Sequence, residues 1–174
     1  IAFLKPILEK NGKVGALYIP QHAFTRSDLD GWVAKALKNG AKGLIWIRFN
    51  NEGKAESPIA KLLPENFLEL VQKVIPGVTF GDTLFLIAAS HKEAWTQLGR
   101  LRCQLGEALN LIDKNKISLF WVVNFPLFEY DEQTKKYISV THPFTAPMQG
   151  WESQELKNMK SRSYDIIFNG VELG

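Results

Sequence analysis

The first part of the chain alternates short apolar runs with stretches of helical periodicity. Continuous apolar runs, typical of buried strands, lie at residues 14–19, 44–49 and 83–88. Between and after them, apolar residues recur every three or four positions, which predicts helices with one buried stripe. This alternation predicts an α+β fold for the first part of the chain.

End signals bound the first two predicted helices. Thr25 and Asp28 form an N-cap pattern, and Asn39-Gly40 is a typical C-terminal signal. The first helix is therefore predicted between these two signals. A second helix is predicted between residues 64 and 76, because a proline at each end suits a helix start and a helix stop.

The third predicted helix is the longest and covers residues 92–109, with Ser90 as its N-cap. Gln97 is predicted to face water, and Cys103 is predicted to be buried as a small hydrophobic residue rather than to act as a reactive thiol. The predicted buried stripe consists of Trp95, Leu98, Leu101, Leu105, Ala108 and Leu109.

A polar junction at residues 113–116 predicts a domain boundary, with one domain at 1–115 and another at 116–174. The chain begins with Ile1 and ends on a strand-like phrase at Gly174. We therefore expect both ends to be cuts in a longer protein.

The second part of the chain has strand patterns and fewer helical ones. Residues 117–123 are apolar enough to predict a strand buried on both faces. Residues 136–140 are predicted to pair with it across a polar loop, and a short helix is predicted near residues 153–159. The last element is a hairpin with Asn169-Gly170 at its turn.

Composition sets few limits on function. Hydrophobic residues make up 45% of the chain and charged residues 22%, as is usual for a globular protein, and the net charge is +3. This charge permits contact with nucleic acid without indicating it. One cysteine excludes an internal disulfide framework and favours a reducing compartment. No apolar run is long enough to predict a membrane span.

The hairpin carries the first candidate site residues. A two-residue turn at Asn169-Gly170 places Asp165 and Glu172 on one face, because side chains alternate along a strand. Carboxylates about 7 Å apart on neighbouring strands are suited to holding Mg²⁺ and, through it, nucleotide phosphates. The alternative is a solvated pair of carboxylates on a hairpin edge.

His142 is the second candidate, because Thr141 and Pro143 flank it in a loop. An imidazole held there is suited to binding a carboxylate substrate, and the alternative is a loop histidine in water. No Cys/His cluster has metal-ligand spacing, and neither glycine-rich phosphate-binding motif occurs. Nothing in the sequence favours a Ser/His/Asp triad.

Several phrases resemble a known enzyme family. Residues 120–129, 142–147 and 164–174 are similar to the class II catalytic domain of bacterial-type aspartyl-tRNA synthetases. Residues 40–47 and 57–61 resemble the GAD insertion domain of these enzymes, and a related domain occurs in an amidotransferase subunit. The resemblance implies a GAD-type domain of alternating helices and strands, followed by a fragment of a class II antiparallel sheet.

The resemblance also implies a reaction and roles for particular residues. Aspartate and ATP form aspartyl-adenylate, and the aspartyl group then passes to tRNA. Glu172 corresponds to a residue that contacts ATP and Mg²⁺, Asp165 to its companion at the metal, and Thr141 and His142 to the loop that approaches aspartate. Many members of the family have a histidine at the position of Thr141. The family usually has an aspartate at the position of Asn124, so Asn124 receives no charge-based role.

Much of the family's site is missing from this chain, including the other class motifs and the anticodon-binding domain. We therefore expect the chain alone to be inactive and to bind neither Mg²⁺ nor ATP tightly, because such chemistry needs many convergent groups. For the parent enzyme, the resemblance implies tRNA, aspartate and ATP as partners, a homodimer, a cytoplasmic location and no membrane.

Two other functions remain possible at this point. The first is a non-catalytic tRNA-interaction or structural module, in which Lys35, Lys38, Lys42 and Arg48 contact RNA. The second is an amidotransferase-related GAD module, which fits the first domain but not the phrases in the second.

Overall fold

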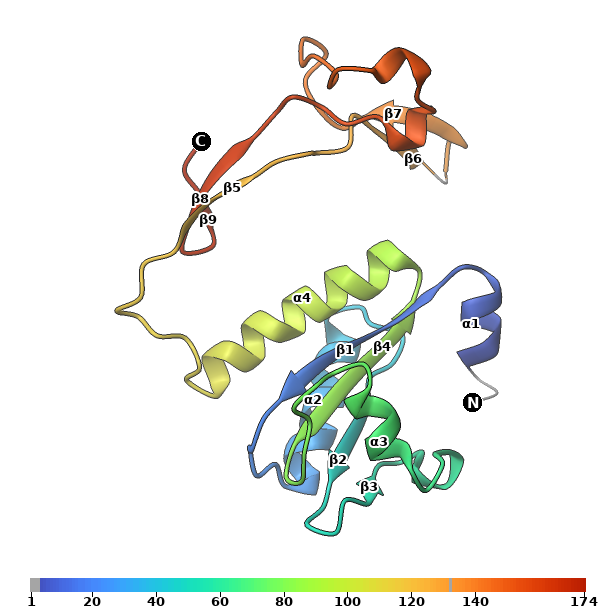
Figure 1. Cartoon of the computed structure of the whole chain (residues 1–174), viewed down its shortest axis with the longest axis vertical. Helices are drawn as coiled ribbons and strands as arrows, with labels where there is room; N and C mark the ends of the chain where they lie inside the picture. The colour runs from blue at the N-terminus through green and yellow to red at the C-terminus, as the bar shows by residue number, and fades with distance from the viewer. Residues whose placement is uncertain (1–3, 132) are drawn as a thin grey trace. The chain divides into compact units, whose positions relative to one another are not determined.

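The computed structural model describes residues 4–131 and 133–174, which form two compact units. The first unit ends at Ile112 and the second begins at Asp113 (Figure 1). Both units contain antiparallel sheets, and the first also contains long helices, so the chain has a mixed α+β fold. Within the described ranges, no helix is both long enough and apolar enough to cross a membrane.

The first unit is built on a four-stranded sheet in the order β1-β4-β2-β3, and every neighbouring pair is antiparallel. The three apolar runs are strands, as predicted: β1 (Lys13–Ile19), β2 (Ile45–Phe49) and β4 (Thr83–Ala89). The short β3 (Ala55–Glu56) pairs with the end of β2 and forms one edge of the sheet.

The three predicted helices are present, although the second is shorter than predicted, and the two predicted N-caps, Thr25 and Ser90, are confirmed. In α2 (Arg26–Lys38), the backbone N–H of Asp28 donates to Thr25 Oγ1 and the Asp28 carboxylate accepts from the Thr25 backbone N–H, which completes a capping box. In α4 (His91–Ala108), the Ser90 side chain accepts from a backbone N–H in the first turn. The shorter elements are α1 (Lys5–Glu9), the 3-10 helix η2 (Ala60–Leu62) and α3 (Phe67–Gln72).

Helices cover both faces of this sheet (Figure 1). On one face, α2 and α4 pack over Trp46 and Phe85, and on the other α3 packs over Ile47 and Leu84. Because successive strand side chains point to opposite faces, β2 and β4 must be apolar at nearly every position. This explains the continuous apolar runs in the sequence.

Four predictions for α4 are wrong. Ala108 was predicted to be buried but is exposed, because it lies in the last turn of the helix, beyond the buried stripe. Cys103 is exposed, because it lies on the side of the helix opposite Leu101 and Leu105. Gln97 is buried, since it falls within the helical stripe that faces the sheet. Trp95 is half exposed and lies beside this stripe, against Gly15 of β1, where any Cβ would clash with its ring.

The buried carboxylate of Asp82 holds the segment that follows β1 through hydrogen bonds. Asp82 accepts hydrogen bonds from the backbone N–H groups of Gln21 (2.9 Å) and Thr79 (2.7 Å), and from the Tyr18 hydroxyl (2.9 Å). Burial raises the pKa of Asp82, but these hydrogen bonds outweigh burial and hold its pKa below the ordinary value. The ionised carboxylate therefore fixes Gln21, whose φ is +46°.

The second unit contains two small sheets. One has the order β5-β8-β9, formed by β5 (Leu119–Val122), β8 (Asp165–Phe168) and β9 (Val171–Glu172). The other is a hairpin of β6 (Phe128–Asp131) and β7 (Lys136–Ser139).

Two predictions for the second unit's strands are wrong. β7 pairs with β6, its immediate neighbour along the chain, and not with β5, which pairs with β8 instead. β5 is also not buried on both faces, since Leu119 and Trp121 are each 58% exposed. The apolar pattern therefore identified a strand but not what covers it.

The predicted short helix of the second unit is replaced by two 3-10 turns, η3 (Trp151–Ser153) and η4 (Leu156–Asn158). After them, the chain runs beside two earlier segments: Leu127 N–H donates to Met159 O (2.9 Å), and Met148 N–H donates to Lys160 O (2.8 Å). Among the described residues of this unit, Leu127 and Met159 are the only buried apolar ones.

Candidate functional site

The hairpin of β8 and β9 has the predicted register. Ile167 lies opposite Glu172, and Phe168 lies opposite Val171. Asn169 and Gly170 form the turn with φ values of +47° and +85°, the left-handed conformations that a tight hairpin requires. The turn prediction is confirmed, and the local sequence accounts for it.

The end of the hairpin differs from a regular ladder. Leu173 N–H donates to Ile166 O (2.9 Å), while Ile166 N–H donates to Gly174 O (2.8 Å). Two residues of one strand therefore lie opposite one residue of the other, as in a β-bulge. Gly174 consequently lies opposite Ile166, whereas a regular hairpin with a two-residue turn would pair Gly174 with Asp165.

The register gives the sheet two chemically different faces. One face carries both carboxylates, and the other is entirely apolar. Because paired residues project from the same side, the apolar face follows directly from the pairing of β5, β8 and β9. The carboxylate face consists of Phe120, Val122, Asp165, Ile167 and Glu172. The apolar face consists of Leu119, Trp121, Ile166, Phe168 and Val171.

Asp165 and Glu172 are the candidate cation ligands on this face. Neither forms an ion pair with another described residue, so their carboxylate oxygens are available. No group of three or more His, Cys, Asp or Glu side chains suited to a metal occurs within the described ranges. A cation here would therefore have two protein ligands at most and would need further oxygens from a substrate or water.

Asn169 is a residue of this site that the sequence reasoning used only as a turn signal. Its side-chain Oδ1 accepts from Ser118 N–H (2.8 Å), and its own N–H donates to Ser118 O (2.9 Å). These two bonds join the hairpin turn to the chain just before β5. Asn169 thus holds the strand that carries Glu172 in place beside its neighbours.

The His142 loop is a tight turn with a defined imidazole. Thr145 N–H donates to His142 O (2.8 Å), and Phe144 N–H donates to His142 Nδ1 (3.2 Å). A nitrogen that accepts a hydrogen bond carries no proton, so the neutral ring has its N–H at Nε2. The His142 side chain is exposed, whereas Thr141 Oγ1 is buried and has no hydrogen-bond partner among the described residues.

The four predicted site residues do not come together in the second unit. Asp165 and Glu172 belong to the β5-β8-β9 sheet, while Thr141 and His142 follow β7. Figure 1 shows the two sheets at opposite ends of the second unit. The carboxylates and the imidazole therefore form no single cluster within this unit.

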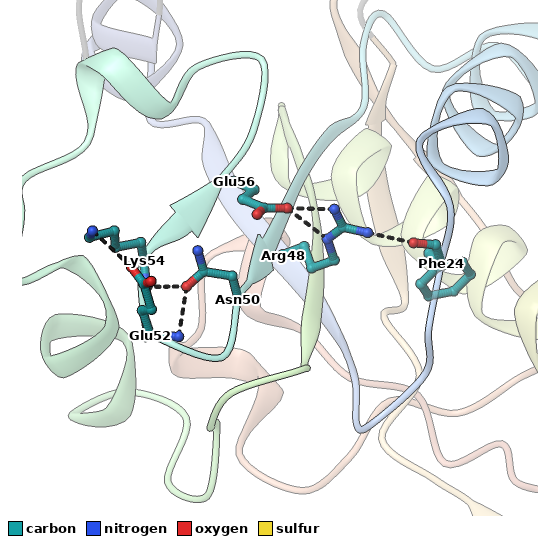
Figure 2. Close-up of polar contacts among 6 residues, drawn as sticks. All are labelled: Phe24, Arg48, Asn50, Glu52, Lys54 and Glu56. Atoms are coloured by element: carbon teal, nitrogen blue, oxygen red, sulfur yellow. Dashed lines mark hydrogen bonds and ion pairs between the residues drawn. The ribbon is translucent and has the colours of Figure 1, made fainter.

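The structure also has a cleft in the first unit, which the sequence did not predict. It has a volume of about 360 Å³ and is lined in part by Arg48, Asn50 and Glu56. Arg48 Nε donates to Glu56 (3.0 Å), and its Nη1 donates to the backbone O of Phe24 (2.6 Å), as Figure 2 shows. The available signal was an arginine inside the otherwise apolar run of β2.

Together, these features describe an α+β domain with helices on both faces of an antiparallel sheet, followed by a second unit with a carboxylate-bearing hairpin. A family model described as GAD domain matches residues 4–98, which is more than half of the chain. The chain belongs to the GAD domain family.

Relatives extend the similarity to both units. An aspartate–tRNA(Asp/Asn) ligase of Desulfotalea psychrophila is 39% identical over 98% of this chain and 28% of its own length. A ligase of the same name from Brachyspira hyodysenteriae is 41% identical over 86% and 26%. An aspartate–tRNA ligase of Halalkalibacterium halodurans is 38% identical over 87% and 26%.

These comparisons confirm the resemblance to aspartyl-tRNA synthetases that the sequence motifs indicated. The chain spans less than a third of the length of these relatives. Because the similarity continues beyond the GAD match into the second unit, the two alternatives, a non-catalytic module and an amidotransferase-related module, are not favoured.

Proposed function

We propose that this chain is part of an aspartate–tRNA ligase. The ligase activates aspartate with ATP to aspartyl-adenylate and pyrophosphate, and then transfers the aspartyl group to tRNA. The observation that carries this proposal is similarity to such a ligase over 98% of the chain.

The residues after 115 belong, in this proposal, to the class II catalytic sheet of the ligase, and residues 1–115 form the GAD insertion domain. The two-faced sheet supports the first assignment. A sheet with carboxylates on one face and only apolar side chains on the other is suited to bind a ligand on the first and to pack against protein on the second.

Glu172 and Asp165 hold Mg²⁺ in the ligase, and Glu172 also contacts ATP. Their donor set fits this ion, because Mg²⁺ is usually bound by one or two carboxylates together with substrate phosphates and water. The bound ion supplies positive charge that offsets the charge of the phosphates. The protein's part is to keep both carboxylates on one face, through the Asn169-Gly170 turn and the Asn169–Ser118 hydrogen bonds.

His142 contacts the substrate aspartate in this proposal, and Thr141 shapes the loop. The exposed Nε2–H of His142 is a donor suited to a carboxylate oxygen, while Nδ1 is already held by Phe144 N–H. Thr141 Oγ1 is buried and so is poorly placed to reach a ligand. The ring orientation is thus set before substrate arrives, which lowers the entropic cost of binding.

The ligase needs more protein than this chain, and we expect the chain alone to form no aspartyl-adenylate. Its carboxylates lie on the β5-β8-β9 sheet and its imidazole lies in the loop after β7, and its relatives are several times longer. For the whole ligase we propose tRNA, aspartate and ATP as partners, a homodimeric state and a cytoplasmic location.

Aspartate-dependent exchange of pyrophosphate into ATP tests this proposal in the intact ligase that contains this chain. Glu172→Gln should lower the exchange rate about 100-fold or more, because a phosphate-side charge contact is lost. Glu155→Gln is the matched control, since Glu155 is an exposed carboxylate of the same unit that pairs with Lys157. Exchange that is absent, or independent of aspartate, would contradict the proposal.

A further inference from the structure

Two adjoining clefts in the first unit lie on either side of the segment that follows β1. One is the 360 Å³ cleft beside Arg48, and the other, of about 530 Å³, is lined in part by Trp32 and Lys35 of α2. Both are also lined by His22 and Phe24. We call these two clefts together the His22 groove.

Hydrogen bonds and ring contacts hold the segment that separates the two clefts. Asp82 fixes Gln21 through its backbone N–H and through its side-chain amide, which donates to Asp82 Oδ1 (2.8 Å). Phe24 is buried against Phe85, with ring centres 5.6 Å apart, and the His22 ring lies edge-on to Phe24 at 4.3 Å. A preformed wall lowers the ordering cost when a ligand binds.

The Arg48 end of the groove is rich in hydrogen-bond donors. Arg48 uses three of its five N–H groups, two on Glu56 and one on Phe24 O, so two remain. Asn50 Oδ1 accepts from the backbone N–H groups of Glu52 and Lys54 (Figure 2), which leaves the Asn50 amide N–H₂ as a donor. Such a cleft suits a ligand group with many acceptor oxygens, such as a phosphate ester.

The α2 end of the groove has flat aromatic surfaces and a cation. Trp32 is partly exposed, and Lys35 Nζ lies 4.7 Å from the centre of its ring. Lys35 forms no ion pair with another described residue, unlike Lys42, which pairs with Glu93 at 3.2 Å. Aromatic faces beside a cation are the features on which unstacked nucleobases bind, with the neighbouring phosphate at the cation.

The charge of the first unit agrees with a polyanionic ligand. Residues 1–112 contain 14 Lys and Arg residues against 10 Asp and Glu residues. We propose that the His22 groove binds a single-stranded segment of RNA, with a base against Trp32 and a phosphate beside Arg48. A duplex is unsuitable, because its bases are stacked and paired. The choice of RNA rests on the proposed function, whereas the phosphate and stacking chemistry does not.

Binding of a labelled single-stranded RNA oligonucleotide to the 174-residue chain, followed by fluorescence anisotropy, tests the proposal. Trp32→Leu should weaken binding about tenfold, because a stacking surface is lost, while Trp32→Phe should keep most of the affinity. Lys35→Gln should weaken binding about threefold and lower the slope of log affinity against log salt by about 0.7.

Lys73→Gln is the matched control for Lys35→Gln. Lys73 follows α3, which covers the other face of the sheet, so its loss removes the same charge far from the groove. Equal effects of the two substitutions would overturn the proposal, as would equal binding of a duplex of the same sequence or no binding at all. Because Lys35 is exposed, its substitution should not disturb folding.

The intact ligase separates this inference from the proposed function. Trp32→Leu should leave aspartate-dependent pyrophosphate exchange unchanged, because that step requires no contact at Trp32. The same variant should raise the KM for tRNA in the transfer step about tenfold. Normal exchange with an unchanged KM would refute the groove alone, whereas a ligase without exchange would refute the proposed function.

Discussion

The two units bury their apolar side chains to very different extents. In the first unit, Phe49, Phe85 and Leu29 are fully buried, and helices cover both faces of the sheet. In the second unit, Trp121 is 58% exposed on a sheet with one wholly apolar face. In the first unit, helices bury the apolar side chains of the sheet on both faces. In the second unit, the apolar face of the β5-β8-β9 sheet is left exposed.

This difference bears on where function resides. A unit that completes its own core can present a preformed groove by itself, and the His22 groove is of this kind. The hairpin with Asp165 and Glu172 belongs to a sheet whose apolar face needs other protein to cover it. Loss of a side chain should therefore have unequal consequences in the two units, and three pairs of substitutions test this.

The largest expected effect is that of Phe85→Ala in β4. Phe85 is fully buried between the sheet and the α2–α4 layer, so its loss leaves a cavity and should destabilise the first unit by about 3–5 kcal/mol. Urea unfolding followed by circular dichroism measures this free energy. Trp121→Ala, the matched aromatic truncation in the second unit, should cost less than about 1 kcal/mol. Equal losses would show that both units are equally well packed.

An intermediate effect is expected for Asp82→Asn. The amide places a donor where the carboxylate accepts from Gln21, Thr79 and Tyr18, so the first unit should lose about 2–3 kcal/mol. The pKa of Asp82 is lowered in the folded state, so the unfolded chain takes up the proton first as pH falls. Its contribution is complete above the ordinary aspartate pKa and is lost as pH falls through the folded value.

The pH dependence of the urea midpoint separates this contribution from the others. Between neutral pH and about pH 3, the midpoint of the wild-type chain should fall more steeply than that of Asp82→Asn. Glu172→Gln is the matched carboxylate-to-amide change in the second unit. At neutral pH it should change the free energy of unfolding by less than about 0.5 kcal/mol, because Glu172 is exposed. If the urea midpoint of Asp82→Asn falls with pH as steeply as that of the wild type, the buried carboxylate makes no such contribution.

Elements with local signals were predictable from the sequence. Thr25 with Asp28 identified the start of α2, and Asn169-Gly170 identified both the turn and the register of its hairpin. These signals depend on residues only a few positions apart, so they can be recognised without knowing the distant contacts. For the same reason, the shared face of Asp165 and Glu172 followed from the turn.

Features that depend on distant contacts were not predictable. Which strand pairs with β7 depends on competition between β5 and β6, and an apolar pattern such as that of β5 does not reveal what covers it. On α4, Cys103 and Gln97 were assigned by residue type, but their exposure follows from which side of the helix meets the sheet. The separation of His142 from the carboxylates likewise depends on how two sheets are arranged.

The smallest effects are expected when one local hydrogen bond is removed in each unit. Asn169→Gly keeps the left-handed turn but removes the acceptor for Ser118 N–H, and Thr25→Ala removes the N-cap of α2. Each bond is worth about 1 kcal/mol, or about a fivefold change in an opening equilibrium. Amide hydrogen exchange should show whether each change stays local or spreads through its unit.

Asn169→Gly should speed exchange at Ser118 alone, because little packing couples that turn to the rest of its unit. Thr25→Ala should speed the slowest amides of β4, since α2 is part of a closed core. If both changes stay local, the first unit is less cooperative than its packing implies.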